Sequence, residues 1–146
     1  VLGDFRPPPM RGELREVDGV RVLVDCYNAN PSSAREALGL LGSLPGRRIA
    51  VLGDMLELGA LAPKFHREVG AYAARCGIDR LLCMGEWAGE MAEGAREGGM
   101  VEVEVFDDKE KLARRVRELA APGDWVLVKG SRRMALEEVI REAFGI

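Results

Sequence analysis

Short, continuous apolar runs alternate along this chain with segments in which apolar residues recur every three or four positions. The runs are typical of buried strands, and the spaced residues are typical of helices with one apolar face. The expected strands are 20–24, 49–52, 81–84, 101–106 and 125–128. The expected helices carry their apolar residues within 34–44, 65–76, 87–95, 112–119 and 136–144. In the second of these helices, Phe65 and Val69 are expected to point inward.

Turn residues add one strand and fix the start of a helix. Asp18-Gly19 separates the alternating segment 13–17 from the run 20–24, which predicts a tight hairpin with 13–17 antiparallel at or near an edge. Asn30 is expected to cap the first helix, with Pro31 as its first residue. Strands that are apolar throughout and joined by helices indicate a parallel sheet covered on both faces. We therefore predict an α/β, Rossmann-like three-layer domain with a mostly parallel sheet of about six strands.

The first residues differ in character from the rest of the chain. Three consecutive prolines at 7–9 prevent helix formation and stiffen the backbone. We interpret 1–10 as an interdomain linker and 11–146 as one domain of a larger protein. The absence of an initial methionine favours the same interpretation.

Composition and charge exclude several classes of protein. The 146 residues are 47% hydrophobic and carry a formal net charge of -3, which gives no reason to expect nucleic acid as a partner. No apolar run approaches the roughly 20 residues that a membrane helix needs. Cys26, Cys76 and Cys83 are odd in number and widely spaced, which favours reduced thiols in a cytoplasmic protein over disulfides or a zinc site.

Unusual polar residues concentrate where the expected strands end. The segments before the strands are short turns, whereas the segments after them carry carboxylates, amides and cations. These polar segments are 25–30, 53–59, 85–86, 107–108 and 129–132. Open α/β sheets bind ligands outside the carboxyl ends of their strands, so we predict a ligand site at that edge.

Two familiar phosphate-binding motifs are missing from the sequence. There is no Gly-x-x-x-x-Gly-Lys-Ser/Thr, and no Gly-x-Gly-x-x-Gly follows any expected strand. The chain is therefore not expected to cradle a nucleotide triphosphate alone or to bind a dinucleotide in the usual way.

The most specific hypothesis from the residues alone is an anion site formed by two cationic side chains. Lys129 and Arg132 lie beside an expected helix start, where a phosphate or carboxylate is the natural partner. The alternative is a salt bridge to the acidic residues of neighbouring loops, Asp25, Asp54 or Glu57. Asp25 in turn could accept hydrogen bonds from a ribose diol or a substrate amine, or only from nearby backbone amides.

The other polar residues differ in how strongly they indicate a ligand site. Tyr27 and Asn28 gain little from a short turn, which favours a ligand role for their loop, whereas Asn30 is expected first as a helix cap. The two carboxylates of 53–59 are weak evidence for a metal site. His66 is the only histidine and is interpreted as a hydrogen-bonded structural residue, and no catalytic triad can be assembled around it.

Three motifs occur in order along the chain. They are Asp25-Cys26-Tyr27-Asn28-Ala29-Asn30-Pro31, then Leu52-Gly53-Asp54-Met55-x-Glu57-Leu58-Gly59 with His66 beyond it, then Val128-Lys129-Gly130-Ser131-Arg132 with Met134. In this order and spacing the sequence resembles, over about 11–144, the carboxy-terminal domain of the Mur ligases of peptidoglycan synthesis. Cys26 departs from the serine common in that family, and Pro8-Pro9-Met10-Arg11 departs from its usual Pro-Gly-Arg.

The resemblance implies a three-domain enzyme that joins D-alanyl-D-alanine to UDP-N-acetylmuramoyl-tripeptide, consuming ATP through an acyl-phosphate. It places UDP binding in the first domain, and the phosphate loop and Mg2+ ligands in the central one. The third domain, this one, is expected to close over ATP and to help receive the dipeptide. The residues that the resemblance assigns to the nucleotide are Asp25, Tyr27, Asn28 and Asn30. Those expected at the substrate are Asp54, Glu57, Lys129, Ser131 and Arg132.

Several consequences and rival hypotheses follow from this resemblance. No residue of the chain is expected to be a self-sufficient catalyst, no metal ligand is assigned here, and we expect the full enzyme to be a cytoplasmic monomer. One rival is a sister Mur ligase or a folylpolyglutamate synthase, which shares the fold but differs in these loops. A rival of another class is a non-catalytic α/β module that binds a nucleotide or another small ligand.

Overall fold

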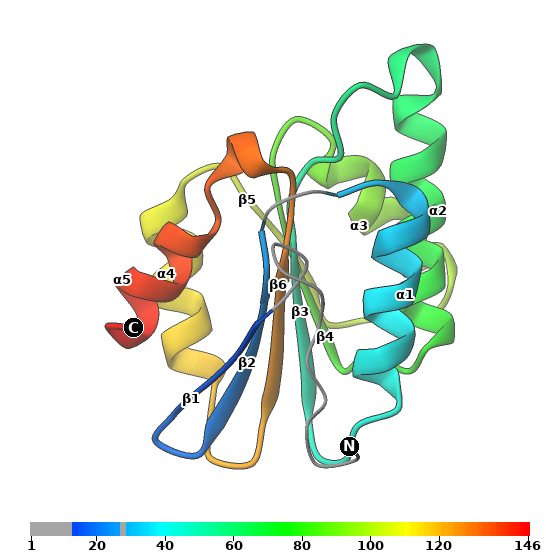
Figure 1. Cartoon of the computed structure of the whole chain (residues 1–146). Coiled ribbons are helices and arrows are strands. Elements are labelled where there is room, and N and C mark those ends of the chain that lie inside the picture. The colour runs from blue at the N-terminus through cyan, green and yellow to red at the C-terminus, as the bar shows by residue number, and fades with distance from the viewer. Residues whose placement is uncertain (1–12, 27–28) are drawn as a thin grey trace, which may run out of the picture.

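The computed structural model describes residues 13–26 and 29–146 (Figure 1). Within these residues strands and helices alternate along the chain. The strands are β1 (Glu13–Val17), β2 (Val20–Asp25), β3 (Arg48–Leu52), β4 (Arg80–Met84), β5 (Val103–Phe106) and β6 (Trp125–Lys129). The helices are α1 (Pro31–Gly42), α2 (Ala62–Arg75), α3 (Ala88–Glu97), α4 (Lys109–Leu119) and α5 (Glu137–Phe144). Two short 3-10 turns, η1 (Gly59–Leu61) and η2 (Arg132–Met134), precede α2 and α5.

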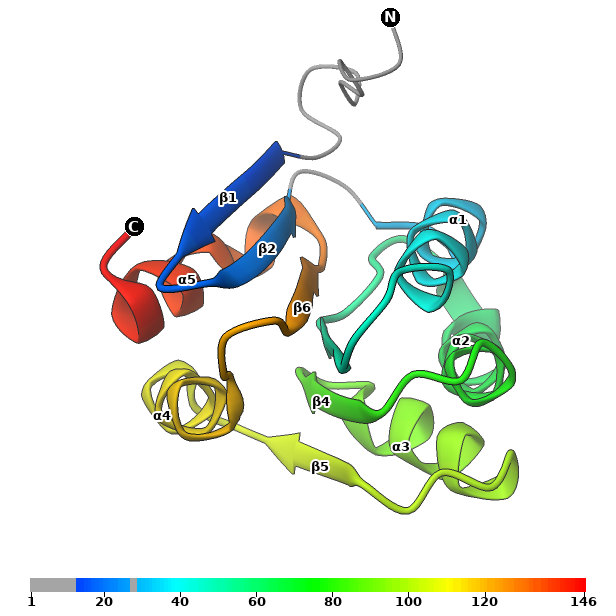
Figure 2. The ribbon, with the colours of Figure 1, turned by 90° about the horizontal axis from the view of Figure 1, so that it is seen from below.

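The strands form one sheet in the order β1-β2-β6-β3-β4-β5. β1 is antiparallel to β2, and the remaining neighbours are parallel. Helices α1, α2 and α3 cover one face of the sheet, and α4 and α5 cover the other (Figures 1 and 2). The predicted three-layer α/β architecture with an antiparallel edge hairpin is confirmed.

The position of β6 decides which loops meet. The chain passes from β2 through α1 to β3, continues outward to β4 and β5, and returns last to β6, which pairs with both β2 and β3. The segments that follow β2, β3 and β6 therefore emerge side by side at the carboxyl edge. Such a reversal of strand order is where open α/β sheets bind their ligands.

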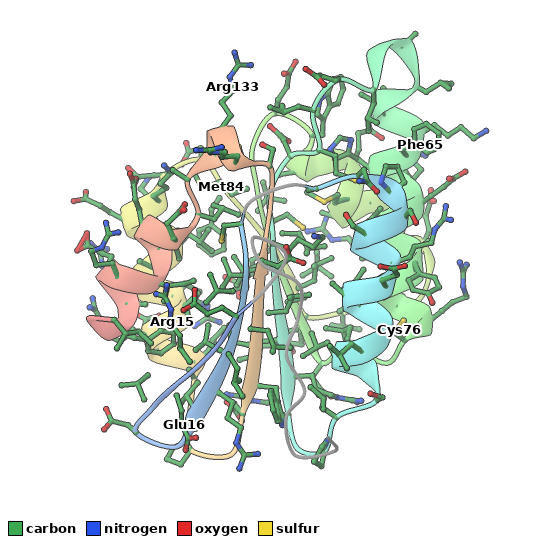
Figure 3. The ribbon with its side chains drawn as sticks, in the orientation of Figure 1. Arg15, Glu16, Phe65, Cys76, Met84 and Arg133 are labelled. Atoms are coloured by element: carbon green, nitrogen blue, oxygen red, sulfur yellow. The ribbon has the colours of Figure 1, made fainter. Side chains whose placement is uncertain are left out.

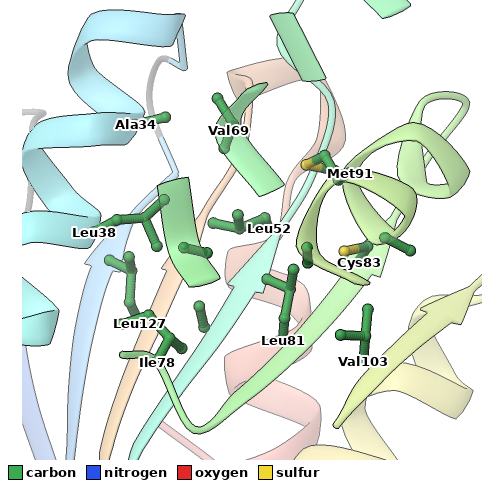
Figure 4. Close-up of a cluster of buried hydrophobic side chains, with 14 of the residues drawn as sticks. Ala34, Leu38, Leu52, Val69, Ile78, Leu81, Cys83, Met91, Val103 and Leu127 are labelled. Atoms are coloured by element: carbon green, nitrogen blue, oxygen red, sulfur yellow. The ribbon is translucent and has the colours of Figure 1, made fainter. Parts of the chain in front are cut away.

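The continuous apolar character of the strands follows from burial on both faces. In β3, Ile49 and Val51 point into the cluster under α4 and α5, whereas Ala50 and Leu52 point into the cluster under α1 to α3. Figure 4 shows the second of these clusters, in which Leu38 and Leu127 lie close together. A strand buried on both faces has no polar side to alternate with, as expected for a parallel sheet.

The predicted turn and caps also form. Asp18 and Gly19 take the positive φ values, 51° and 83°, that a tight hairpin turn requires. Asn30 caps α1 by accepting a hydrogen bond from the Ser33 N–H, and the Ser33 hydroxyl accepts one from the Asn30 N–H. This reciprocal capping box satisfies two backbone donors at the start of the helix.

One predicted element boundary is wrong, and one predicted helix face differs in detail. β5 begins at Val103 and not at Val101, which is 85% exposed. The Glu102 carbonyl already accepts the Leu81 N–H of β4 over 3.0 Å. In α2, Val69 points inward as predicted, together with His66 and Ala73, while Phe65 is half-buried and packs at the margin of the core. His66 is therefore more deeply buried than its apolar neighbour Phe65.

Candidate functional site

Buried polar side chains gather at the carboxyl edge of the sheet. Among the described residues, the buried polar or charged side chains near this edge belong to Asp54, His66, Lys129 and Ser131. A fifth, Asp124, lies at the opposite edge and is bonded to Arg47 over 2.7 Å. Burial of polar groups is unfavourable unless they are bonded, so this concentration at one edge marks a built site.

Backbone hydrogen bonds hold two of the central loops together, those after β3 and β6. The Gly53 N–H donates to the Lys129 carbonyl over 2.8 Å, and the Ser131 N–H donates to the Asp54 carbonyl over 3.0 Å. Gly53 and Gly130 approach so closely that a Cβ on Gly130 would lie 3.3 Å from the Gly53 Cα and 2.6 Å from the Leu136 side chain. The loops after β3 and β6 thus form one rigid unit, and glycine is needed where they touch.

Lys129 forms a buried ion pair with Asp25. Its ammonium nitrogen lies 2.8 Å from Asp25 Oδ2, with the Lys129 side chain 2% exposed and that of Asp25 17% exposed. The two residues are register partners at the ends of β6 and β2. The sequence left open whether Lys129 faces an external anion or a neighbouring carboxylate, and the structure shows the carboxylate.

Asp54 caps the start of the α3 segment. One carboxylate oxygen accepts from the Glu86 N–H over 2.8 Å and the other from the Trp87 N–H over 2.9 Å. Gly85, with φ of +122°, has no Cβ, and one there would lie 2.5 Å from this carboxylate. Asp54 therefore ties the loop after β3 to the loop after β4.

His66 holds the same loop from the other side. Its Nε2 accepts the Met55 N–H over 3.0 Å, so Nδ1 carries the proton and donates it to the Ala62 carbonyl over 2.6 Å. The ring is fully buried and stacks on Trp87, with centroids 5.8 Å apart. Burial lowers the pKa of His66 below its ordinary value of 6.5, against the opposing effect of the Ala62 bond. This geometry supports the predicted structural role over that of a catalytic base.

The last of the three loops offers cations and a hydroxyl. Arg132 and Arg133 are exposed, and Figure 3 shows Arg133 pointing away from the body of the domain above the sheet edge. The Ser131 hydroxyl is buried and has no hydrogen-bond partner within 13–26 and 29–146. A buried hydroxyl without a partner is unusual and suits a ligand atom.

The remaining predicted residues are placed unevenly. Asn30 is engaged in the α1 cap, and Glu57 is exposed on its loop with a left-handed φ of 64°. Tyr27 and Asn28 lie outside the described residues. The segment 107–108 follows the distant edge strand β5, where Asp108 caps α4 instead of joining the central loops.

Two absences concern the described residues alone. No three histidine, cysteine or acidic side chains among them gather as a metal site. No helix in this part of the chain is long and apolar enough to cross a membrane.

Sequence reasoning missed two features of the site. Trp87 both stacks on His66 and donates its N–H to Asp54, and no local pattern indicates this. Glu137, the first residue of α5, has a buried Oε1 without a partner in the described part of the chain. An acidic residue directly after the buried Leu136 was the only available signal.

Cys26 follows Asp25 at the end of β2 and belongs to the core cluster under α4 and α5. Its thiol is buried, lies 3.7 Å from the Val128 carbonyl, and has its pKa raised to about 12 by burial and by the nearby Glu137 and Asp25 carboxylates. Burial also raises the pKa of Cys83 to about 12. Thiolates are the reactive form of cysteine, so both of these thiols are inert in the folded chain.

Alkylation tests this assignment. We expect iodoacetamide near neutral pH to modify only the half-buried Cys76 in the native chain, and all three cysteines in denaturant, as read by mass spectrometry. Modification of Cys26 at a rate close to that of Cys76 would contradict a closed edge at β2.

Comparison with known proteins gives consistent similarities. Residues 10–132 match the family model described as Mur ligase, glutamate ligase domain. The chain is 41% identical over 145 residues to UDP-N-acetylmuramoyl-tripeptide--D-alanyl-D-alanine ligase of Bacillus subtilis, an alignment that covers 97% of this chain and 32% of that protein. The chain thus spans about a third of the length of this relative.

Solved structures show the same similarity. The MurF ligase of Thermotoga maritima in complex with ADP superposes with a TM-score of 0.78 at 29% identity, covering 97% of this chain and 32% of that one. A MurF structure from Acinetobacter baumannii gives a TM-score of 0.84 at 24% identity, over 99% of this chain and 32% of that one. The second of these similarities concerns the fold alone.

Proposed function

This chain belongs to the Mur ligase family, and we propose on that basis that it is the carboxy-terminal domain of the ligase that adds D-alanyl-D-alanine to UDP-N-acetylmuramoyl-tripeptide. The proposal extends to a monomeric, cytoplasmic enzyme in which first and central domains precede this one. The similarity to the Bacillus subtilis ligase and to a MurF ligase solved in complex with ADP supports ATP as a further substrate.

The observation that carries the proposal is the position of β6 between β2 and β3. It brings the three motifs that carry the family resemblance to one edge, joined by the Gly53 and Ser131 backbone bonds and by the Asp25–Lys129 pair. Open α/β sheets bind ligands where the strand order reverses, so the convergence of the three motifs at this point supports a ligand site there.

The reaction determines which groups are useful there. ATP first phosphorylates the tripeptide carboxylate, and the dipeptide amine then attacks the acyl-phosphate to form a tetrahedral intermediate and release phosphate. Both steps concentrate negative charge on oxygen, and cations or N–H groups aimed at that charge stabilise the transition states. Mg2+ supplies such charge when bound, and the family resemblance assigns its ligands to the central domain.

The chain's own residues then take distinct roles. Asp25 contacts the nucleotide, together with Tyr27, Asn28 and, secondarily to its cap, Asn30. The substrate side is formed by Arg132 as an anion ligand, by Ser131, whose buried hydroxyl has no partner among the described residues, and by Glu57 on the exposed loop. We propose that Asp54 shapes this side through its bonds to Glu86 and Trp87, and that Lys129 acts beside Asp25.

A comparison of the isolated and complete proteins tests the proposal. Purified residues 1–146 should release no phosphate with ATP, UDP-N-acetylmuramoyl-tripeptide and D-alanyl-D-alanine, because they lack a phosphate loop, and should bind ATP only weakly by calorimetry. The complete protein should release phosphate only when all three substrates are present.

Three results would contradict the proposal. Ligation by residues 1–146 alone would overturn the division of labour between domains. Tight ATP binding by the isolated chain, with no ligation by the complete protein, would favour a nucleotide-binding module. Activity of the complete protein with another amino acid in place of the dipeptide would favour a sister ligase.

A further inference from the structure

We infer that Lys129 is a positioning residue for the nucleotide: its ammonium group holds the Asp25 carboxylate in place to receive the hydroxyls of the ATP ribose. The inference rests on the proposed function and assigns Lys129 a role through Asp25 instead of a direct contact with substrate.

The two side chains of the ion pair differ in their exposure to solvent. The Lys129 side chain is 2% exposed and that of Asp25 is 17% exposed, with 2.8 Å between Lys129 Nζ and Asp25 Oδ2. A ligand approaching this edge therefore reaches the carboxylate, while the ammonium lies behind it. A carboxylate has about four lone-pair sites, so the bond to Lys129 does not by itself exhaust the acceptor capacity of Asp25.

The backbone makes the pair rigid. Asp25 and Lys129 are register partners on the parallel strands β2 and β6, and each is the last residue of its strand. The Lys129 carbonyl accepts the Gly53 N–H over 2.8 Å, which fixes the same residue to the loop after β3. Lys129 thus contacts the first motif with its side chain and the second with its backbone.

A neutral diol suits this ion pair better than a phosphate does. An external phosphate would have to reach a Lys129 side chain that is 2% exposed, and it would meet the negative charge of the Asp25 carboxylate 2.8 Å from the ammonium nitrogen. A neutral diol needs no displacement, because vicinal hydroxyls donate to the carboxylate oxygens and leave the ion pair intact. Arg132 and Arg133 are the exposed cations of this loop.

A double-mutant cycle on the complete enzyme tests the inference. We expect Lys129→Met and Asp25→Asn each to raise the KM for ATP about tenfold, and the double variant to be no more than about twofold worse than Asp25→Asn alone. Independent action would instead multiply the two effects to about a hundredfold, which would show direct contact by Lys129 and overturn the inference.

Nucleotide analogues separate positioning from general damage. Wild-type enzyme should prefer ATP over 2′-deoxyATP and 3′-deoxyATP by about tenfold in kcat/KM, and this preference should fall toward one in Lys129→Met. A preference that stays unchanged in Lys129→Met, despite a raised KM, would contradict the inference. This ratio is measured on the folded fraction alone, so it remains informative if the variant is less stable.

Lys109→Met is the matched control. Lys109 forms an ion pair with Glu138 over the similar distance of 2.9 Å, but on the surface. The Lys109→Met variant should leave both the KM for ATP and the preference for ATP over its deoxy analogues unchanged. An inactive wild-type enzyme would refute the proposed function, whereas an active enzyme with multiplicative effects would refute only the role of Lys129.

Discussion

Replacing Gly94 with alanine should lower the free energy of unfolding of the chain by about 3 kcal/mol. Gly94 is buried in α3, where a Cβ would overlap the carbonyl oxygen of Arg67 in α2. The contact is reciprocal, because a Cβ on Gly70 of α2 would overlap the carbonyl oxygen of Met91 in α3. Neither backbone can move aside without separating the helices, so added volume here cannot be absorbed by a rotamer change. Urea denaturation followed by circular dichroism gives the number.

Gly89→Ala is the control within the same helix. Apart from its chain neighbours and the backbone of its own helix, no atom of the described residues lies within 4 Å of a Cβ placed on Gly89. Alanine there should raise stability by about 0.5 kcal/mol, because it reduces the conformational freedom of the unfolded chain. Equal and small effects at the two positions would mean that α2 and α3 do not pack through their glycines.

This close packing also matters for the site. α2 carries His66, and the segment leading into α3 donates the Glu86 and Trp87 N–H groups to Asp54. Moving the two helices apart would pull on both anchors of the loop after β3. The glycines therefore contribute to loop geometry, although they lie away from the carboxyl edge.

The sequence predicts features that depend on neighbours along the chain. The Asp18-Gly19 turn, the Asn30 cap and the apolar strands follow from local geometry, and the structure has all of them. The sorting of polar residues to one edge is predictable for the same reason, because every parallel strand ends on that side.

Contacts between residues that lie far apart in the sequence are harder to predict. Charges in the sequence permitted Lys129 to face either an external anion or Asp25, and only the pairing of β6 with β2 decides for Asp25. Gly70 and Gly94 look in the sequence like ordinary weak points of helices, since the partner backbone lies in another helix.

His66 shows that the spacing of apolar residues does not identify every buried residue of a helix. Apolar spacing favours Phe65 as the inward residue, because a histidine inside is unfavourable without partners. Here both ring nitrogens are bonded, one to the Met55 N–H and the other to the Ala62 carbonyl, and these partners cannot be read from the spacing. The buried position of His66 in α2 also places it against the loop after β3.

His66→Ala should lower the free energy of unfolding at neutral pH by about 3 kcal/mol. The change leaves the buried Met55 N–H without its acceptor, removes the stack on Trp87, and opens a cavity in a fully buried position. In the complete enzyme, the loosened loop should raise the KM for D-alanyl-D-alanine more than the KM for ATP. Denaturation curves and steady-state kinetics measure the two effects.

Acidification should shrink this difference in stability between wild type and His66→Ala. The pKa of His66 is lowered in the folded state, mainly by burial, so below about pH 6.5 the unfolded chain binds a proton that the folded chain does not. Wild-type stability is therefore full above that pH and falls by up to about 1.4 kcal/mol per pH unit until the folded histidine titrates. Carboxylates are common to both proteins and cancel in the comparison. A difference that stays constant or widens from pH 7 to pH 5 would show that the folded chain accepts the proton on His66, contrary to the neutral, doubly bonded ring.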